Sequence, residues 1–206
     1  MKIHTDVSQR SLQWYELRRG RITATGFQSV QAGGQGKMRT GYMKKLRSER
    51  VHGVTISSGF KTTGAMQTGI EREDEARIAF EKATGIVVET VGFVECDHWM
   101  GISPDGLIGD DGGFEVKCPD LVTHDDYIEA GTLPSAYKWQ IHGSMMATGR
   151  KYWYFVSYHP DARPEDRLFI LKVERDEKIC DDLRYECDKF IAELKTKILN
   201  RTGMDF

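Results

Sequence analysis

The sequence of 206 residues contains no run of about 18 consecutive apolar residues, the length that a membrane-spanning helix needs. Its first residues, MKIHTDVSQRS, also lack the apolar core of a signal peptide. These absences exclude a membrane span and favour the cytosol as the compartment. A charged fraction of 29% with an aromatic fraction of 10% is typical of a soluble folded protein. The length suits one domain with a sizeable core, so we expect residues 1–206 to form a single domain.

Cysteine is scarce, and its spacing excludes several classes of site. The four cysteines, Cys96, Cys118, Cys180 and Cys187, form no CxxC pair. This argues against zinc centres, iron–sulfur clusters and thioredoxin-like redox sites. Cys180 and Cys187 lie seven residues apart in a helical stretch, which places both on one face, and we expect buried thiols there.

The net charge of -2 is too small to mark the chain as a nucleic-acid binder, but the charges are unevenly distributed. Residues 1–60 carry 11 Lys and Arg against 3 Asp and Glu, a net of +8, which leaves a net of -10 for residues 61–206. A basic segment joined to an acidic remainder fits a polyanion-binding surface beside a carboxylate-rich site. Two solvated faces that partly neutralise one another are the alternative interpretation of this split.

Hydrophobic periodicity predicts an α+β domain in which helices flank a central mixed sheet. In the basic part, residues 1–60, we expect a helix capped by Ser11, a further segment after Thr23 and a basic amphipathic helix over 40–52, with a glycine-rich loop at 31–37. In residues 61–206 we expect helices over 63–84, 135–148 and from 176 onward. Strands are expected at 86–95, 99–102, 114–118, 151–158 and 167–174. The apolar stripe of the last helix should pack on the sheet.

The segment from Ser103 to Lys117 carries the clearest chemical signal. Side chains alternate along a strand, so Glu115 and Lys117 should point the same way while Val116 points into the core. Asp105, in the sequence Ser-Pro-Asp-Gly, would face them across a hairpin. Carboxylate oxygens with a backbone carbonyl suit Mg²⁺, and a nearby lysine can aim a water or offset charge on a phosphate. In isolation, a turn beside a solvated ion pair explains the same residues.

Further motifs are arranged around this segment in a recognisable order. They are Trp14–Ala24 (WYELRRGRITA), Gly69–Arg77 (GIEREDEAR), Ser103–Leu107 (SPDGL), Glu115–Pro119 (EVKCP), Tyr137–Gln140 (YKWQ), Trp153–Pro160 (WYFVSYHP) and Glu174–Lys178 (ERDEK). Together they cover most of the chain. In this order the sequence resembles the phage lambda exonuclease family of alkaline exonucleases, within the PD-(D/E)xK nuclease superfamily.

The resemblance implies a role for individual residues. Asp105, Glu115 and the carbonyl of Val116 would hold metal, and Lys117 would be the catalytic lysine. Glu73 falls on the additional acid of the family, with Glu71 and Glu75 as neighbouring alternatives. Four further residues fall on a pocket that grips the 5′-phosphate of a DNA end: Arg18, Thr25, Ser103 and Gln140. Lys37 or Arg39 would replace a DNA-gripping arginine that the family carries in the glycine-rich loop.

The resemblance also implies an activity and partners. The expected enzyme is a Mg²⁺-dependent 5′→3′ exonuclease that degrades one strand of linear double-stranded DNA from 5′-phosphorylated ends and leaves 3′ overhangs for single-strand annealing. It would use two Mg²⁺ ions, with Mn²⁺ able to substitute, form a ring-shaped homotrimer and cooperate with a phage-type annealing protein. The alternatives are another nuclease of the superfamily, such as a junction resolvase or a restriction-type endonuclease, and a non-catalytic DNA-binding module.

Overall fold

The computed structural model describes residues 1–32, 36–56 and 64–203, and for residues 64–71 it describes the backbone only. Helices are α1 (Leu12–Arg18), α2 (Phe27–Gln31), α3 (Lys37–His52), α4 (Gly64–Thr84), α5 (Leu121–Ala130), α6 (Lys138–Thr148) and α7 (Glu177–Thr202). Strands are β1 (Lys2–His4), β2 (Phe93–Glu95), β3 (Gly101–Ile102), β4 (Gly106–Ile108), β5 (Gly112–Lys117), β6 (Tyr152–Tyr158) and β7 (Leu168–Glu174). Over these ranges, no helix is both long and apolar enough to cross a membrane.

The strands form two sheets. The larger sheet has the order β4-β5-β6-β7, in which β5 and β6 are parallel and the other pairs are antiparallel. The smaller sheet is antiparallel, with the order β1-β2-β3. The predicted α+β fold with a central mixed sheet is therefore confirmed, and the short second sheet is an addition to it.

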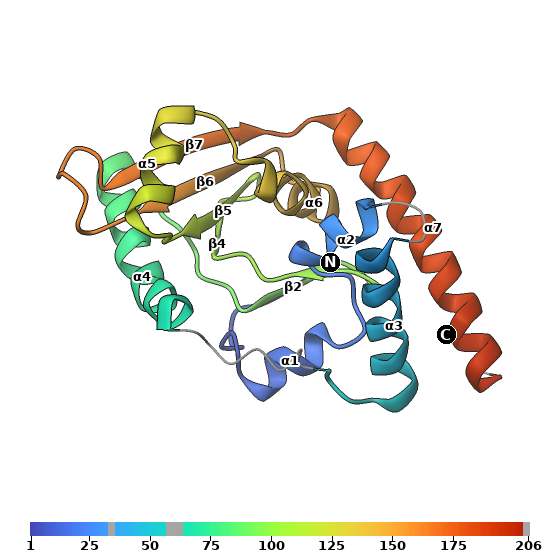
Figure 1. Cartoon of the computed structure of the whole chain (residues 1–206). Helices are drawn as coiled ribbons and strands as arrows, with labels where there is room; N and C mark the ends of the chain where they lie inside the picture. Colours follow the sequence, from blue (N-terminus) through green and yellow to red (C-terminus); the bar gives the residue numbers. More distant parts are fainter. Residues whose placement is uncertain (33–35, 57–63, 204–206) are drawn as a thin grey trace.

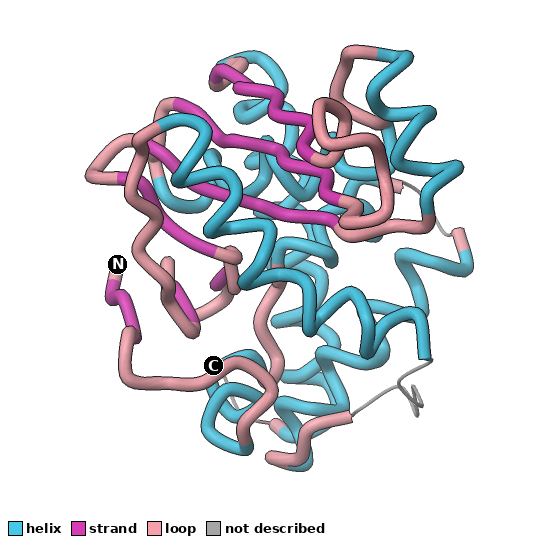
Figure 2. The backbone as a smooth tube through the Cα atoms, turned by 90° about the vertical axis from the view of Figure 1, so that its left-hand side faces the viewer, coloured by secondary structure: helices cyan, strands magenta, loops and turns pink. Residues whose placement is uncertain are grey.

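Side chains along β6 alternate between the two faces of the larger sheet, and their contacts show which helices cover each face. The Tyr154 ring packs edge-on against Phe80 of α4, with ring centroids 5.1 Å apart. Phe155, the next residue, faces the other way and contacts Tyr127 of α5 and Tyr137 just before α6. The sheet thus lies between α4 on one face and α5 and α6 on the other (Figure 1). Figure 2 shows α4, which begins at the end of a grey trace, running across the strands.

Local signals predicted the helix ends well. The Ser11 hydroxyl accepts a hydrogen bond from the Trp14 N–H at the start of α1, and Asp176 caps α7 in the same way. Gly85 and Gly149 follow α4 and α6 with φ of +72° and +74°, a conformation that glycine adopts without steric cost. The predicted helix start at residue 63 and part of the glycine-rich loop, residues 33–35, lie outside the described residues.

The predicted strand over 86–95 is wrong for most of its length. Only Phe93–Glu95 is a strand, and Glu89 makes a single bridge to Leu107 of β4. This run passes from the larger sheet to the smaller one, so neither sheet pairs with all of it. The hairpin partner of β5 is β4, for which no strand was expected, whereas the strand expected at 99–102 corresponds to β3 of the smaller sheet. Because β4 has only three residues, it is too short to be recognised in the sequence by alternating apolar and polar residues.

The prediction that the last helix packs on the sheet is also wrong. The apolar stripe of α7 is buried mainly against α2, α3 and α6, in one cluster with side chains such as Leu46 and Ile141. A helix of 26 residues is about 39 Å long at 1.5 Å per residue, so it extends well past a four-stranded sheet. In Figure 1 it runs alongside α3 at the right of the molecule. Cys180 and Cys187 are buried free thiols on this stripe, as predicted.

Candidate active site

Strand β5 places an acid and a lysine side by side. Phe114 and Val116 are buried in the cluster beneath α4, so Glu115 and Lys117 point to the opposite face. The Lys117 ammonium donates a hydrogen bond to Glu115 Oε1. The same oxygen accepts a second bond from the side-chain amide of Gln140 on α6. Glu115, only 3% exposed, is therefore a buried carboxylate that is held between two donors.

Asp105 reaches the same strand from the turn before β4. Its Oδ2 accepts a hydrogen bond of 2.8 Å from the Val116 N–H. Burial, and then the negative charge of Glu115, raise the pKa of Asp105 well above its usual value. The hairpin register explains the proximity, because Gly106 pairs with Phe114 and the residues on either side must lie close. The turn and the strand together form one acidic centre.

Lys117 is the cation of this centre. Burial alone would lower the pKa of its ammonium group, but the carboxylates of Glu115 and Asp105 outweigh burial and raise that pKa above its usual value. Lys117 therefore keeps its proton at neutral and mildly alkaline pH. Its side chain can hold charge and donate hydrogen bonds there.

A third carboxylate comes from α4. The Glu73 side chain is near enough to Asp105 to contribute to the raised pKa of that residue, and burial raises the pKa of Glu73 itself. Its oxygens contact the Arg10 guanidinium at 3.3 and 3.4 Å. Of the two alternatives, Glu75 is turned away and accepts a hydrogen bond from the Tyr158 hydroxyl. The side chain of Glu71 lies outside the described residues.

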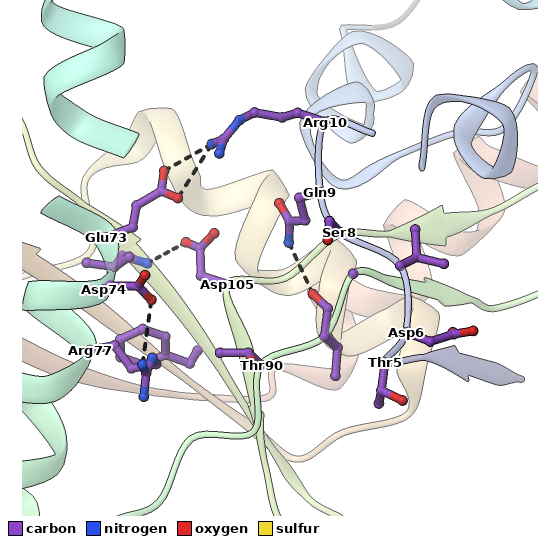
Figure 3. Close-up of a pocket in the computed structure, with 15 residues that line it drawn as sticks. Thr5, Asp6, Ser8, Gln9, Arg10, Glu73, Asp74, Arg77, Thr90 and Asp105 are labelled. Atoms are coloured by element: carbon purple, nitrogen blue, oxygen red, sulfur yellow. Dashed lines mark hydrogen bonds and ion pairs between the residues drawn. The ribbon is translucent and has the colours of Figure 1, made fainter. Parts of the chain in front are cut away.

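A cavity of about 460 Å³ opens over two of these acids, Glu73 and Asp105, whereas Glu115 and Lys117 do not line it. One wall is the segment Thr5–Arg10, and the opposite wall includes Glu73 and Asp105. Figure 3 shows the Arg10 and Glu73 side chains pointing toward one another, with Asp105 turned into the same space. A substrate that enters here would lie against the carboxylates of Glu73 and Asp105.

The side-chain atoms available as metal ligands fit a hard divalent cation. Glu73, Asp105 and Glu115 offer only oxygen, which Mg²⁺ and Mn²⁺ prefer. A bound cation would offset the burial, and the repulsion from Glu115, that raise the pKa of Asp105. In the described part of the chain, however, no three His, Cys, Asp or Glu side chains stand in the arrangement of a ready-formed metal site. Each carboxylate instead has a partner from the protein: Arg10, the Val116 N–H, or Lys117 with Gln140.

A second group of donors lies beside the Ser-Pro-Asp-Gly turn. Arg18 Nη1 donates a hydrogen bond of 2.8 Å to Ser103 Oγ, and its guanidinium lies 4.1 Å from the centre of the Trp14 ring. Trp14 Nε1 also donates to Ser103 Oγ, at 2.9 Å. Burial lowers the pKa of Arg18, which an anion bound at the guanidinium would offset. Arg18 and Ser103 thus form a preorganised pair two residues from Asp105.

The other two residues predicted for this pocket lie elsewhere. Gln140 is bonded to Glu115, as described above, which links it to the acids. Thr25 is exposed in a short 3₁₀ turn, and its side chain makes no hydrogen bond to any residue that the structure describes. The geometry therefore joins Arg18 with Ser103 and Gln140 with Glu115. The assignment of these four residues to a phosphate pocket stays a prediction.

The basic N-terminal segment contributes to a groove between α3 and α7. It has a volume of about 530 Å³ and is lined by the cations Arg39, Lys44, Arg47, Lys189 and Lys197 with Glu186 and Glu193. Arg39, one of the two predicted DNA-gripping residues, pairs with Glu193 at 2.7 Å and stacks on Phe190. The other, Lys37, is exposed at the first position of α3.

Sequence reasoning missed the cavity wall formed by residues 5–10. Gln9 and Arg10 belong to no recognised motif, and Arg10 is 63 residues from Glu73 in the chain. The available signal was weak: an arginine directly before the helix cap Ser11. Its proximity to the acids is decided by tertiary structure.

Residues 13–151 match the YqaJ-like viral recombinase domain. A search of curated proteins gives no match. Among solved structures, the chain is 32% identical to an alkaline exonuclease, LHK-Exo, from Laribacter hongkongensis, with a TM-score of 0.84 over 94% of this chain and 98% of that one. A second structure of LHK-Exo, in complex with dAMP, gives 33% identity, the same TM-score and the same coverage.

A phage-related exonuclease from Haemophilus somnus 129PT shares the fold, with a TM-score of 0.63 and 14% identity over 89% of this chain and 99% of that one. The family match covers more than half of the chain and includes Asp105, Glu115 and Lys117. The chain therefore belongs to the YqaJ-like viral recombinase family, with the fold of the lambda-type alkaline exonucleases, and is a nuclease of that family.

Proposed function

We propose that the protein is a Mg²⁺-dependent exonuclease that degrades one strand of linear double-stranded DNA in the 5′→3′ direction from 5′-phosphorylated ends. The observation that carries this proposal is the Ser-Pro-Asp-Gly turn. Ser103 of this turn is bonded to Arg18, and Asp105 of the same turn is bonded to the strand that carries Glu115 and Lys117. Donors for a terminal phosphate and acids for phosphodiester hydrolysis thus lie on one short segment. This adjacency favours the removal of nucleotides from an end.

The protein's own residues have separable roles in this proposal. Arg18 and the Ser103 hydroxyl would bind the 5′-phosphate, since a planar guanidinium forms paired hydrogen bonds with phosphate oxygens. The Lys117 ammonium, which keeps its proton, would stabilise negative charge that builds on the scissile phosphate. Gln140 would orient Glu115, to which it is bonded.

Two Mg²⁺ ions, for which Mn²⁺ could substitute, would be held by Asp105, Glu115 and the Val116 carbonyl, with Glu73 nearby. They would activate the attacking water and stabilise the leaving 3′ oxygen. The dAMP complex of LHK-Exo supports a site for a single nucleotide in this fold, because that structure is 33% identical over nearly the whole chain.

The resemblance to lambda-type exonucleases also leads us to propose a homotrimeric ring around DNA and a phage-type single-strand annealing protein as partner, which would coat the 3′ overhang. Light scattering gives the mass in solution and tests the first proposal. Copurification with the annealing protein tests the second.

Digestion of linear duplex with and without Mg²⁺ tests the proposed activity. Wild-type protein should shorten 5′-phosphorylated duplex only with the metal, and should leave a 3′ overhang. Asp105→Ala and Lys117→Ala should each abolish digestion while the far-ultraviolet circular dichroism stays unchanged. Lys151→Ala is the matched control, because Lys151 also pairs with a carboxylate, Asp111, but lies on the exposed surface.

A covalently closed plasmid separates the alternatives. An exonuclease should leave it intact, whereas a restriction-type enzyme would cut it, and a junction resolvase would cut four-way junctions. Retained digestion in Asp105→Ala or Lys117→Ala would contradict the active-site assignment. Binding of duplex with no cleavage under any metal would indicate a DNA-binding module.

A further inference from the structure

The segment Thr5–Arg10 follows β1 and forms one wall of the cavity above Glu73 and Asp105. All six of its residues line that cavity, opposite Glu73 and Asp105 (Figure 3). This wall is built by a part of the chain to which the proposed function gives no role.

Hydrogen bonds connect this wall to the Ser-Pro-Asp-Gly turn. The side-chain amide of Gln9 donates hydrogen bonds to the carbonyl of Pro104 at 2.9 Å and to the carbonyl of Val91 at 3.2 Å. Pro104 directly precedes Asp105. The position of residues 9 and 10 is therefore coupled to the position of the acid.

The backbone of Arg10 is strained. Its φ is +69°, and within the described part of the chain it is the one non-glycine residue with positive φ. Such a conformation costs a residue with a Cβ roughly 1 kcal/mol and persists where the surrounding structure imposes it. Here the Gln9 bonds on one side and the capped helix α1 on the other impose it. The result is that the Arg10 side chain points into the cavity.

The contact that Arg10 makes there is easily exchanged. Its guanidinium lies 3.3 Å from Glu73, and the two side chains are 45% and 36% exposed. Exposed pairs of this kind contribute at most about 1 kcal/mol. A phosphate group offers a guanidinium shorter, paired hydrogen bonds, so DNA in the cavity would compete well for Arg10.

We propose that Arg10 is a DNA-contacting residue, whose guanidinium rests on Glu73 in the DNA-free protein and moves to a backbone phosphate when duplex occupies the cavity. This inference rests on the proposed function, since it takes DNA as the substrate. It adds a positively charged contact on the wall opposite the acids, separate from the Arg18–Ser103 pair.

Binding of Arg10→Gly to DNA tests the proposal. Glycine removes the guanidinium and adopts the positive φ without strain, so the variant should fold with an unchanged or higher melting temperature. Fluorescence anisotropy with a 5′-phosphorylated duplex in EDTA, at a series of NaCl concentrations, measures affinity without cleavage. We expect affinity to fall about tenfold, and the slope of log affinity against log salt to become shallower by about one.

Two further variants make the result specific. Arg163→Gly removes an arginine that is also paired with a carboxylate, Asp166, but lies in an exposed loop that does not line this cavity, and it should bind as wild type does. Arg10→Lys keeps the charge but not the paired hydrogen bonds. It should therefore restore the salt slope and only part of the affinity.

An Arg10→Gly variant with wild-type affinity and salt slope would overturn the proposal and leave Arg10 as a partner of Glu73 only. Weaker binding with an unchanged slope and a lower melting temperature would also overturn it, in favour of a structural role. Wild-type protein that does not bind duplex would overturn the proposed function together with this inference, so the wild-type measurement distinguishes the two failures.

Discussion

Asp105 illustrates how one residue can serve a site at the expense of stability. Burial and the charge of Glu115 raise its pKa, so without metal the folded state favours the protonated carboxyl. A carboxyl whose pKa is raised on folding loses stabilisation as the pH rises through the folded-state pKa. The stabilisation begins to fall above the usual Asp pKa of 3.8, where the carboxyl ionises in the unfolded chain. It is fully lost once Asp105 has ionised in the folded protein as well.

We therefore predict that Asp105→Asn is more stable than wild type in EDTA at pH 8, and that the difference disappears toward pH 4. The amide oxygen of asparagine can still accept from the Val116 N–H, so the geometry is kept. Thermal melts at both pH values measure the effect, at roughly 2–4 °C for each kcal/mol in a chain of this length. Added Mg²⁺ should raise the melting temperature of wild type but not of the variant. A variant that is less stable at pH 8 would contradict this account.

Arg18 carries the second prediction at this scale. Because its guanidinium is already oriented by Ser103 and Trp14, a 5′-phosphate would meet a preformed donor. Arg18→Ala should lose most of the preference for 5′-phosphorylated over 5′-hydroxyl ends, by about tenfold or more, since hydrogen bonds to charged groups contribute about 1.5–3 kcal/mol. Initial digestion rates on the two substrates give the ratio. The same ratio in wild type and variant would remove Arg18 from the pocket.

At the scale of elements, α7 holds the helical part of the molecule together. Leu183, Phe190, Leu194 and others of its stripe are fully buried against α2, α3 and α6. The same cluster contains Ile22 and Phe27 from the basic N-terminal part. The helix therefore connects the end of the chain to its beginning.

Leu194→Ala should lower the free energy of unfolding by about 2–5 kcal/mol, the cost of lost burial and of the cavity that remains. Asp188→Ala, on the exposed side of the same helix, should change it by less than about 0.5 kcal/mol. Urea denaturation of the two variants measures both values. Equal effects would mean that the stripe is not a packed interface.

At the scale of the whole molecule, charge is segregated while the net charge stays at -2. The +8 of residues 1–60 includes Arg10 and Arg18 near the acids, and Arg39, Lys44 and Arg47 in the groove beside α7. The acidic residues of 61–206 include Glu73, Asp105 and Glu115 of the candidate site. A small net charge is thus compatible with basic residues that gather in one groove and acidic residues that gather in the candidate site.

If α3 lies along the DNA, affinity for duplex should fall linearly with salt on logarithmic axes. Lys44→Gln and Arg47→Gln should then each make the slope shallower by about 0.9, because each phosphate contact releases condensed counterions. Titrations at several NaCl concentrations measure the slopes. Unchanged slopes in both variants would place the DNA on another face of the molecule.

The sequence by itself determined the features that depend on neighbours along the chain. Helix ends followed from Ser11, Asp176, Gly85 and Gly149 because caps and left-handed glycines act within one turn. The pairing of Glu115 with Lys117 followed from alternation along a strand. The fold class followed from hydrophobic periodicity, and the family followed from motifs that occur in order over most of the chain.

Tertiary structure alone decided the features that join distant segments. The extended run before β2 divides between two sheets, and α7 packs on helices, because each outcome depends on which surfaces remain uncovered after the chain folds. The contact of Arg10 with Glu73 joins residues 63 positions apart, held by Gln9 and a strained backbone. No local pattern encodes such a contact, because its energy comes from groups that only folding brings together.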